Sequence, residues 1–175
     1  STSNTIAGVP ENVRNIAVPR VFKGIVLNQV NLGDFGKGHD GGRKTNEDFL
    51  ELIKFLEQIE GIDRYRISSI EPNLLTDDII RFVAGSKKFM PHFHIPLQSG
   101  SDKILGLMRR RYQRDLYIER VSLIKKLIPH CAIGVDVIVG FPGETDEDFK
   151  ETYDFLHSLE ISYLHVFTYS ERPNT

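Results

Sequence analysis

The sequence of 175 residues contains one cysteine, no tryptophan and no long apolar run. The single cysteine, Cys131, excludes a disulfide within the chain, and it excludes a cysteine-ligated metal cluster built from these residues alone. No segment approaches the roughly 20 apolar residues that cross a bilayer, and the first residues do not resemble a signal peptide. These absences predict a protein of the reducing cytoplasm that does not enter a membrane.

An excess of charge of either sign is also missing. The chain has 22 Lys and Arg against 24 Asp and Glu, a formal net charge of -2, so its bulk charge does not indicate a nucleic-acid binder. A hydrophobic content of 40% and a charged content of 26% are ordinary for a globular protein of one domain. An apolar segment ends near Thr168, just before the last residues, so we expect the chain to be part of a longer protein.

The clearest local pattern lies in residues 132–159. Residues 132–139 are mostly apolar or β-branched, which predicts a buried strand, and a Gly-Phe-Pro-Gly turn follows. Thr145 and Asp148 then predict a helix N-cap and its N3 carboxylate. Helical spacing predicts that four residues of this helix face the core: Phe149, Tyr153, Leu156 and Leu159. The glycines of the turn either let a ligand approach the backbone or form an ordinary connection.

Strand-like and helix-like segments alternate along the chain. We expect strands at residues 21–30, 65–70, 92–97, 132–139 and 161–168. We expect helices to begin at Thr45, Thr76, Asp102, Asp115 and Thr145, with Gly85 as the C′ residue of the second. The alternation predicts an α/β fold, in which a parallel sheet with outer helices either closes as a barrel or stays open.

Polar residues and glycines follow the expected strands. They are Asn31 and Asp34, Glu71, Gln98 and Ser101, Gly140 and Glu144, and Tyr169 and Ser170. Because the carboxyl ends of parallel strands meet at one edge, where ligands bind in such folds, these residues predict one shared binding site.

Two histidines, His92 and His94, are two residues apart in an expected strand and therefore point to one face. They could ligate a divalent metal as in barrel hydrolases, with His165 and Asp136 as further ligands, or they could be a structural or substrate-facing pair. Glu71 could hold a sugar diol or a ligand ammonium, or it could form a solvated salt bridge.

A basic segment contains Arg109, Arg110, Arg111 and Arg114, with Tyr112 among them. Arginine clusters bind phosphates and stack on bases, which makes these four residues candidates for RNA binding. A charged run after a helix is also typical of a solvated surface, so both interpretations stay open.

Four motifs stand in order along the chain: Phe93–Ser101, Met108–Tyr112, Asp136–Thr145 and Phe167–Arg172. Their residues and spacing resemble the radical S-adenosylmethionine methylthiotransferases, from about Ile25 to Thr175. The His-Phe-His-Ile-Pro and Arg-Arg-Arg-Tyr sequences are most similar to the branch that acts on threonylcarbamoyladenosine in tRNA. Sister branches act on isopentenyladenosine in tRNA or on an aspartate of a ribosomal protein.

The resemblance implies a partial (β/α)6 barrel, a three-quarter TIM-like barrel of which this chain would hold the last five parallel strands and their outer helices. Residues 1–22 match the family poorly. The chain also has Asn28-Gln29 where the family usually has Thr-Gly. Residues 23–175 would be the barrel domain without its first strand and cluster loop. The chain would therefore be a fragment of a tRNA-modifying transferase.

The family uses S-adenosylmethionine and two 4Fe-4S clusters, with tRNA and an electron donor as partners. One cluster lies on a Cys-x3-Cys-x2-Cys loop that this chain lacks, so the resemblance implies that the chain alone does not cleave S-adenosylmethionine. The implied cofactor contacts are Asn31 at the methionyl group, Glu71, Gln98 and Ser101 near the ribose and sulfonium, Gly140 through its backbone, and Phe167 and Tyr169 at the adenine.

Two other functions stay open from the residues. One is a metal-dependent hydrolase built around His92, His94 and His165. The other is a non-catalytic fragment that binds RNA through residues 109–114. The oligomeric state is not indicated by any pattern in the sequence.

Overall fold

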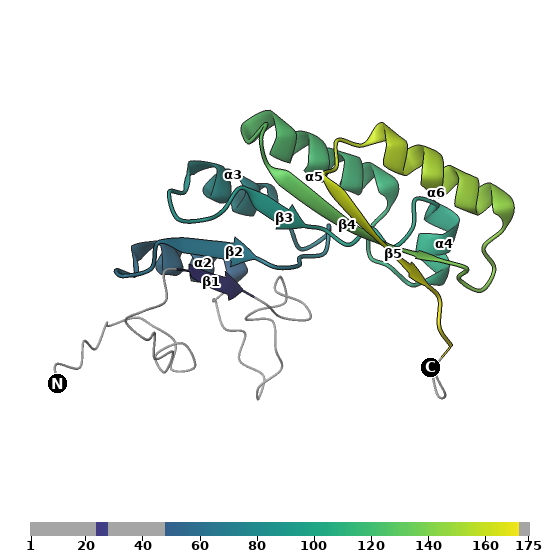
Figure 1. The fold of residues 1–175 in the computed structure, drawn as a ribbon, viewed down its shortest axis with the longest axis horizontal. Coiled ribbons are helices and arrows are strands. Elements are labelled where there is room, and N and C mark those ends of the chain that lie inside the picture. Colours follow the sequence, from purple (N-terminus) through teal and green to yellow (C-terminus); the bar gives the residue numbers. More distant parts are fainter. Residues whose placement is uncertain (1–23, 28–47, 172–175) are drawn as a thin grey trace.

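The computed structural model describes residues 24–27 and 48–171, in which strands and helices alternate as predicted (Figure 1). The strands are β1 (Gly24–Leu27), β2 (Arg64–Ile67), β3 (His92–His94), β4 (Ala132–Val139) and β5 (Tyr163–Thr168). The helices are α2 (Phe49–Gln58), α3 (Asp77–Gly85), α4 (Asp102–Leu107), α5 (Arg114–Leu127) and α6 (Asp146–Ser158). Asn31 and Thr45 lie outside the described residues.

All strand pairs in the described residues are parallel, which confirms the predicted α/β class. The strands form a two-stranded sheet, β1-β2, and a three-stranded sheet, β3-β4-β5, rather than one continuous layer. The two sheets meet where the Met90 amide donates to the Tyr65 carbonyl at 2.8 Å. The ladder is then interrupted, because Pro91 has no amide hydrogen and the His92 amide bonds to the Met90 carbonyl instead.

Two strands end earlier than predicted, and β5 begins two residues later than predicted, at Tyr163. Residues 65–70 and 92–97 were expected as strands, but β2 ends at Ile67 and β3 ends at His94. The chain after β3 still runs beside β4, since the Ile95 amide bonds to the Gly134 carbonyl at 2.9 Å and the Leu97 amide to the Asp136 carbonyl at 3.1 Å. The pairing thus brings residues 95–98 to the same edge as the end of β4.

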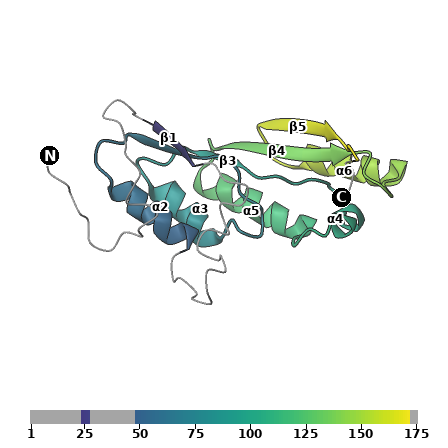
Figure 2. The same ribbon diagram turned by 90° about the horizontal axis from the view of Figure 1, so that it is seen from below.

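The helices α2, α3, α4 and α5 cover one side of the strands (Figure 2). The core lies between these two layers and is apolar, with Tyr65, Phe93, Ile133 and Val135 fully buried. Cys131 is buried at the start of β4, as predicted for a small apolar residue. Burying this face is the main source of stability that the sequence offers.

The opposite side of the strands is open. Alternate residues of β3, β4 and β5 point there, and the parallel register places His94 beside Gly134 and Asp136 beside His165. The strand β5 is exposed on its other side as well, since Leu164 and Val166 are 38% and 55% exposed. The two sheets of the described residues therefore do not close into a barrel.

Local capping signals fix most helix starts. The predicted caps Thr76 and Thr145 are confirmed, and Thr145 forms a complete capping box with Asp148 at the start of α6. The prediction of Thr45 as the cap of α2 is wrong, because Asp48 caps that helix and accepts a hydrogen bond from the Glu51 amide at 2.9 Å. The helix α2 therefore begins three residues later than a cap at Thr45 would place it.

The end of α3 also differs from the prediction. Gly85 is the last residue of the helix rather than a C′ residue, and Ser86 follows as the C-cap with extended backbone. The Ser86 hydroxyl accepts from the Phe89 amide at 2.8 Å, so a serine turn ends this helix in place of a left-handed glycine. None of the helices within residues 24–27 and 48–171 is long and apolar enough to cross a membrane.

The predicted core face of α6 is right at Leu156 and Leu159, which pack against the core, and wrong in the first half of the helix. Phe149 and Tyr153 are 49% and 54% exposed, whereas Asp148, Thr152 and Phe155 are buried. The two buried polar residues face the loop after β3 and have hydrogen-bond partners there. A purely hydrophobic criterion cannot identify this face, because polar contacts between distant segments set the rotation of the helix.

Candidate functional site

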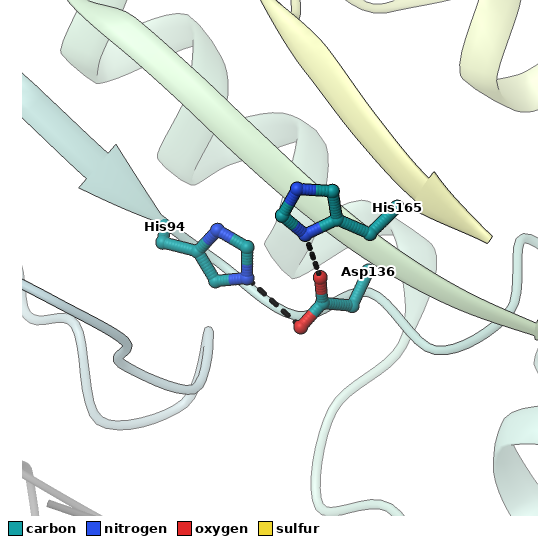
Figure 3. Close-up of side chains that lie close together, drawn as sticks. All are labelled: His94, Asp136 and His165. Atoms are coloured by element: carbon teal, nitrogen blue, oxygen red, sulfur yellow. Dashed lines mark hydrogen bonds and ion pairs between the residues drawn. The ribbon is translucent and has the colours of Figure 1, made fainter. Parts of the chain in front are cut away.

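The centre of the open face is an Asp136 carboxylate held between two imidazoles (Figure 3). His94 Nε2 lies 2.8 Å from Asp136 Oδ2, and His165 Nδ1 lies 3.1 Å from Asp136 Oδ1. The three residues come from the adjacent strands β3, β4 and β5. Their side chains range from mostly buried to open: 13% exposed for His94, 21% for Asp136 and 54% for His165. The His165 side of this group is therefore accessible from solvent.

Tyr163 and Arg66 extend the group into a row. The Tyr163 hydroxyl lies 3.3 Å from His94 Nδ1 and 2.8 Å from His92 Nε2. Arg66 on β2 places Nη2 3.0 Å from His92 Nε2. The imidazole tautomers determine which of these contacts donate. The polar row thus runs from β2 to β5 across the break between the two sheets.

Gly134 makes room for this row. A Cβ atom at Gly134 would lie 2.1 Å from Tyr163 Cζ, so only glycine allows the Tyr163 ring to lie across β4. The ring stacks on His92 with centroids 6.0 Å apart and is tilted against His165 at 5.3 Å. Tyr163 is a site residue that the sequence reasoning missed. The glycine in the middle of a β-branched strand was the signal that could have pointed to it.

The environment of His92 favours its neutral form. Burial lowers the pKa of His92 below its ordinary value, and the positive charge of Arg66 lowers that pKa further. A neutral imidazole has one acceptor nitrogen, and His92 Nδ1 accepts from Arg66 Nε at 3.3 Å. His92 therefore acts at neutral pH as a hydrogen-bonding link between Arg66 and Tyr163.

The group His94, Asp136 and His165 also offers one ligand atom each within 4.8 Å of one another, a set that a divalent cation could take. The predicted metal set is corrected in one respect: His92 is not part of this group, because its ring nitrogens contact Arg66 and Tyr163. The hydrogen bonds between the three residues satisfy them without an ion, so the geometry allows a metal but does not require one.

Two predicted site residues lie at the carboxyl edge with left-handed backbone. Gln98 has φ of 70° and Gly140 has φ of 75°. The Gly140 amide donates to the Glu144 carboxylate, and a Cβ at Gly140 would meet nothing within 4 Å. Conformation rather than crowding therefore explains this glycine. The roles of both residues at a cofactor stay predictions.

Ser101 has a different environment from the one expected at a ligand site. Its side chain is fully buried, and its hydroxyl donates to Asp148 Oδ1 at 3.1 Å. Beside it, the Gly100 amide donates to Thr152 Oγ1 at 3.0 Å, and a Cβ at Gly100 would lie 2.7 Å from Thr152 Cα. The Ser-Gly-Ser sequence thus packs closely on α6 and positions the loop after β3.

Asp148 is the anionic centre of that contact. Lys103 Nζ donates to Asp148 Oδ2 at 2.6 Å, and the Thr145 amide donates to the same oxygen at 3.0 Å. These donors hold the pKa of Asp148 well below its usual range, with Lys103 as the largest cause. The carboxylate therefore stays ionised and ties the start of α6 to the loop after β3.

Aromatic residues continue the open face toward the carboxyl edge. Phe167 is 52% exposed, and its ring centroid lies 6.4 Å from that of His165. Tyr169 meets Phe141 edge to face at 5.2 Å. Exposed aromatic rings on a sheet can stack on a base, which is compatible with the predicted adenine contact of Phe167 and Tyr169.

The predicted arginines divide into two sets. Arg114 has an intramolecular role: it pairs with Glu151 at 2.8 Å, donates to the Gly100 carbonyl at 3.3 Å and lies over the Phe155 ring. Arg110 pairs with Glu71 at 3.0 Å, in a pocket that Arg109 and Arg111 also line. Glu71, a predicted cofactor contact, is thus part of an ion pair at this edge.

Cys131 does not suit a metal cluster. It is buried at the start of β4, and burial raises the pKa of its thiol to about 11. It is the chain's only cysteine, so these residues do not fit a cysteine-ligated iron–sulfur cluster.

Comparison with known proteins gives a consistent result. Residues 11–156 match the family model of the radical SAM superfamily. The chain is 43% identical over 155 residues to the threonylcarbamoyladenosine tRNA methylthiotransferase MtaB of Bacillus subtilis, covering 88% of this chain and 33% of that protein. It is 42% identical over 154 residues to the tRNA-2-methylthio-N(6)-dimethylallyladenosine synthase of Pelotomaculum thermopropionicum, covering 88% and 34%. The chain spans about a third of the length of these curated relatives.

A solved structure with a similar fold is coproporphyrinogen III oxidase (HemN) from Escherichia coli, described as a radical SAM enzyme. The two folds superpose with a TM-score of 0.61 at 18% sequence identity, over 71% of this chain and 29% of that chain. At this identity the similarity concerns the arrangement of strands and helices alone.

Proposed function

The chain belongs to the radical SAM superfamily, and from that premise we propose that it is part of a tRNA methylthiotransferase, most like the threonylcarbamoyladenosine branch. The observation that carries this proposal is the identity of 40–45% to tRNA methylthiotransferases across most of the chain. The His-Phe-His-Ile-Pro and Arg-Arg-Arg-Tyr sequences of this chain favour the threonylcarbamoyladenosine branch over the isopentenyladenosine branch.

In this proposal residues 23–175 belong to a three-quarter (β/α)6 barrel, and the open face of β3, β4 and β5 is the barrel's interior. The five parallel strands with helices on one side support this assignment. The interior would hold S-adenosylmethionine and the target adenosine together, because the polar row supplies hydrogen-bond donors and acceptors there and the aromatic residues of β5 supply stacking surfaces.

The proposed cofactor contacts are Glu71, Gln98, Gly140, Phe167 and Tyr169, together with Asn31, which lies outside the described residues. Ser101 would act by fixing the loop that carries Gln98, since its hydroxyl is bonded to Asp148. S-adenosylmethionine, when reduced at a cluster, supplies a radical. This chain's residues do not fit such a cluster, so its own contribution is to bind and orient the cofactor and the base.

Nucleoside analysis of tRNA tests the proposal. Deleting the gene that encodes this chain should remove the methylthio derivative of threonylcarbamoyladenosine from hydrolysed tRNA, measured by mass spectrometry, and the intact gene should restore it. The methylthio derivative of isopentenyladenosine is the internal control and should persist. If only the isopentenyladenosine derivative is lost, the protein belongs to the sister branch. If both methylthio derivatives are retained, the protein does not methylthiolate tRNA.

A second measurement concerns the isolated 175-residue chain. After iron–sulfur reconstitution and reduction, we expect no 5′-deoxyadenosine from added S-adenosylmethionine, because Cys131 is the only thiol and is buried. Chromatographic detection of 5′-deoxyadenosine above a chain-free blank would contradict this expectation.

Metal-dependent hydrolysis is the second candidate, and the juxtaposition of His94, Asp136 and His165 is the observation that favours it. Equilibrium dialysis with zinc distinguishes the two. Binding of one ion that is lost in His94→Ala and His165→Ala, but kept in the control His92→Ala, would support a metal centre. Absence of stoichiometric binding would remove this candidate.

A further inference from the structure

We propose that a pocket formed by Asn73 and the arginines 109–111 is a binding subsite for the ribose-phosphate backbone of an RNA substrate. The pocket lies at the carboxyl edge, between the loop after β2 and the loop after α4, and has a volume of about 230 Å³. This inference deepens the proposed function, since it rests on RNA as the substrate class and names where its backbone is held.

The charge of the pocket favours an anion. Three guanidinium groups line it, from Arg109, Arg110 and Arg111, against the single carboxylate of Glu71. Glu71 pairs with Arg110 at 3.0 Å and thus neutralises one of the three. Arg109 and Arg111 are exposed, so their side chains can reach a phosphate without first leaving a buried contact.

The backbone at Arg109 has a conformation that is unfavourable for arginine. Arg109 has φ of 55°, in the left-handed region that glycine adopts without cost. It follows the end of α4, where the Arg110 amide bonds to the Leu105 carbonyl at 2.9 Å, the long-range bond of a Schellman ending. Glycine would be the less strained residue at this position. A strained non-glycine residue in a pocket points to a function of its side chain.

Two residues that line this pocket each carry a buried polar atom without a hydrogen-bond partner among the described residues: Arg110 Nε and Asn73 Oδ1. The first is a donor and the second an acceptor, so a ligand that satisfies both needs an acceptor oxygen and a hydroxyl donor. A phosphodiester supplies only acceptors. A ribose-phosphate unit supplies phosphate oxygens for the arginines and a 2′-hydroxyl for Asn73, which favours RNA over DNA.

The pocket is fixed to the same framework as the polar row. Tyr112, next to the arginines, is buried, and its hydroxyl donates to the carbonyls of Pro96 and Leu97 at 3.2 Å each. These two residues continue from β3, which carries His94. A bound backbone would therefore be held at a defined position relative to the open face, where the target base would be placed. Arg114 is not part of this subsite, since it is engaged with Glu151 and Gly100.

Fluorescence anisotropy with a short labelled anticodon stem-loop RNA tests the subsite on the 175-residue chain. Arg109→Gly and Arg111→Ala should each weaken binding about tenfold, as expected for loss of one charged hydrogen bond. Each should also lower the slope of log affinity against log salt by about 0.7. Because Arg109→Gly relieves backbone strain, its thermal midpoint should stay equal or rise, which separates lost binding from misfolding.

Lys126→Ala is the matched control, because it removes one exposed positive charge from the far end of α5. It should leave RNA affinity unchanged. Equal weakening by Lys126→Ala, or unchanged affinity in both arginine variants, would overturn the proposal.

A DNA stem-loop of the same sequence tests the ribose contact. The parent chain should prefer RNA, and Asn73→Ala should reduce that preference; equal affinity of the parent for both would overturn this part. The nucleoside analysis is independent of these measurements, so failure of the subsite leaves the methylthio nucleoside result intact. A different nucleoside product would in turn leave the effects of the arginine variants on RNA affinity intact.

Discussion

The helix-covered face and the open face of β3, β4 and β5 are built from alternate residues of the same strands, yet they differ in chemistry. Phe93, Ile133 and Val135 on the covered face are fully buried and apolar. Their neighbours on the open face include His94 and Asp136, which are partly exposed and bonded to each other. The strands β3 and β4 thus supply the core with one side and the candidate site with the other, whereas β5 is exposed on both sides.

The contribution of a strand to the core and its contribution to the candidate site can therefore be changed separately. A substitution on the covered face should act on folding, whereas a substitution on the open face should act on the hydrogen-bonded row. Four substitutions or titrations test that separation and the contact that positions the loop after β3, in order of decreasing expected effect.

The largest effect is expected at Phe93. Phe93→Ala should lower the free energy of unfolding by about 3–5 kcal/mol, because it leaves a cavity in the core. His165→Ala on the open face should cost less than about 1 kcal/mol, since His165 is about half exposed and its contact with Asp136 is partly solvated. Urea denaturation measures both. Equal costs would contradict the separation of the faces.

Gly134→Ala is the second test, because Gly134 lies in β4 directly beside the Tyr163 ring of the open face. The new Cβ would overlap the Tyr163 ring, so we expect a loss of about 1–3 kcal/mol in unfolding free energy and displacement of Tyr163 from His92. Combining Gly134→Ala with Tyr163→Ala should cost less than the sum of the two changes, since the overlap is gone. Additive costs would show that the contact is not as close as the structure indicates.

The third test is acid titration of the contact at the start of α6. The folded-state pKa of Asp148 is depressed, so its stabilising contribution is present above the ordinary carboxyl pKa of about 3.9 and is lost as pH falls through the folded-state value. Asp148→Asn should therefore be less stable than the parent at neutral pH and approach it in strong acid. A difference that is constant with pH would contradict an ionised Asp148.

The smallest effect concerns His92. Because the folded-state pKa of His92 is lowered, its imidazole should titrate below the ordinary value of about 6.5 in NMR spectra. The unfolded chain takes up this proton first, so acidification below that value should slightly favour unfolding. Replacing Arg66 with Met should raise the pKa of His92. An unchanged pKa of His92 in Arg66→Met would contradict this effect of the arginine charge.

Features set by neighbouring residues were predictable from the sequence. The strand at 132–139 and the Thr145–Asp148 capping box are confirmed because both depend on residues within one or two turns. The parallel α/β class follows from the alternation of strands and helices for the same reason. The division into two sheets was not predictable, since it arises where Pro91 interrupts pairing between distant segments.

The candidate site was predicted in part. His94, Asp136 and His165 were named as possible metal ligands, and the structure brings those three together while it places His92 with Arg66. Tyr163 was missed because an aromatic residue in a strand usually indicates only a strand. Its role depends on the register that sets it opposite Gly134, which local sequence does not specify.

The buried thiol of Cys131 gives experimenters a built-in reporter. With a pKa of about 11, on the order of one molecule in ten thousand carries a thiolate at pH 7, and the side chain is covered in the folded state. Alkylating reagents should therefore label only molecules that have opened. Pulsed alkylation followed by mass spectrometry would count those molecules in a mixture, without a fluorescent tag and without an added cysteine.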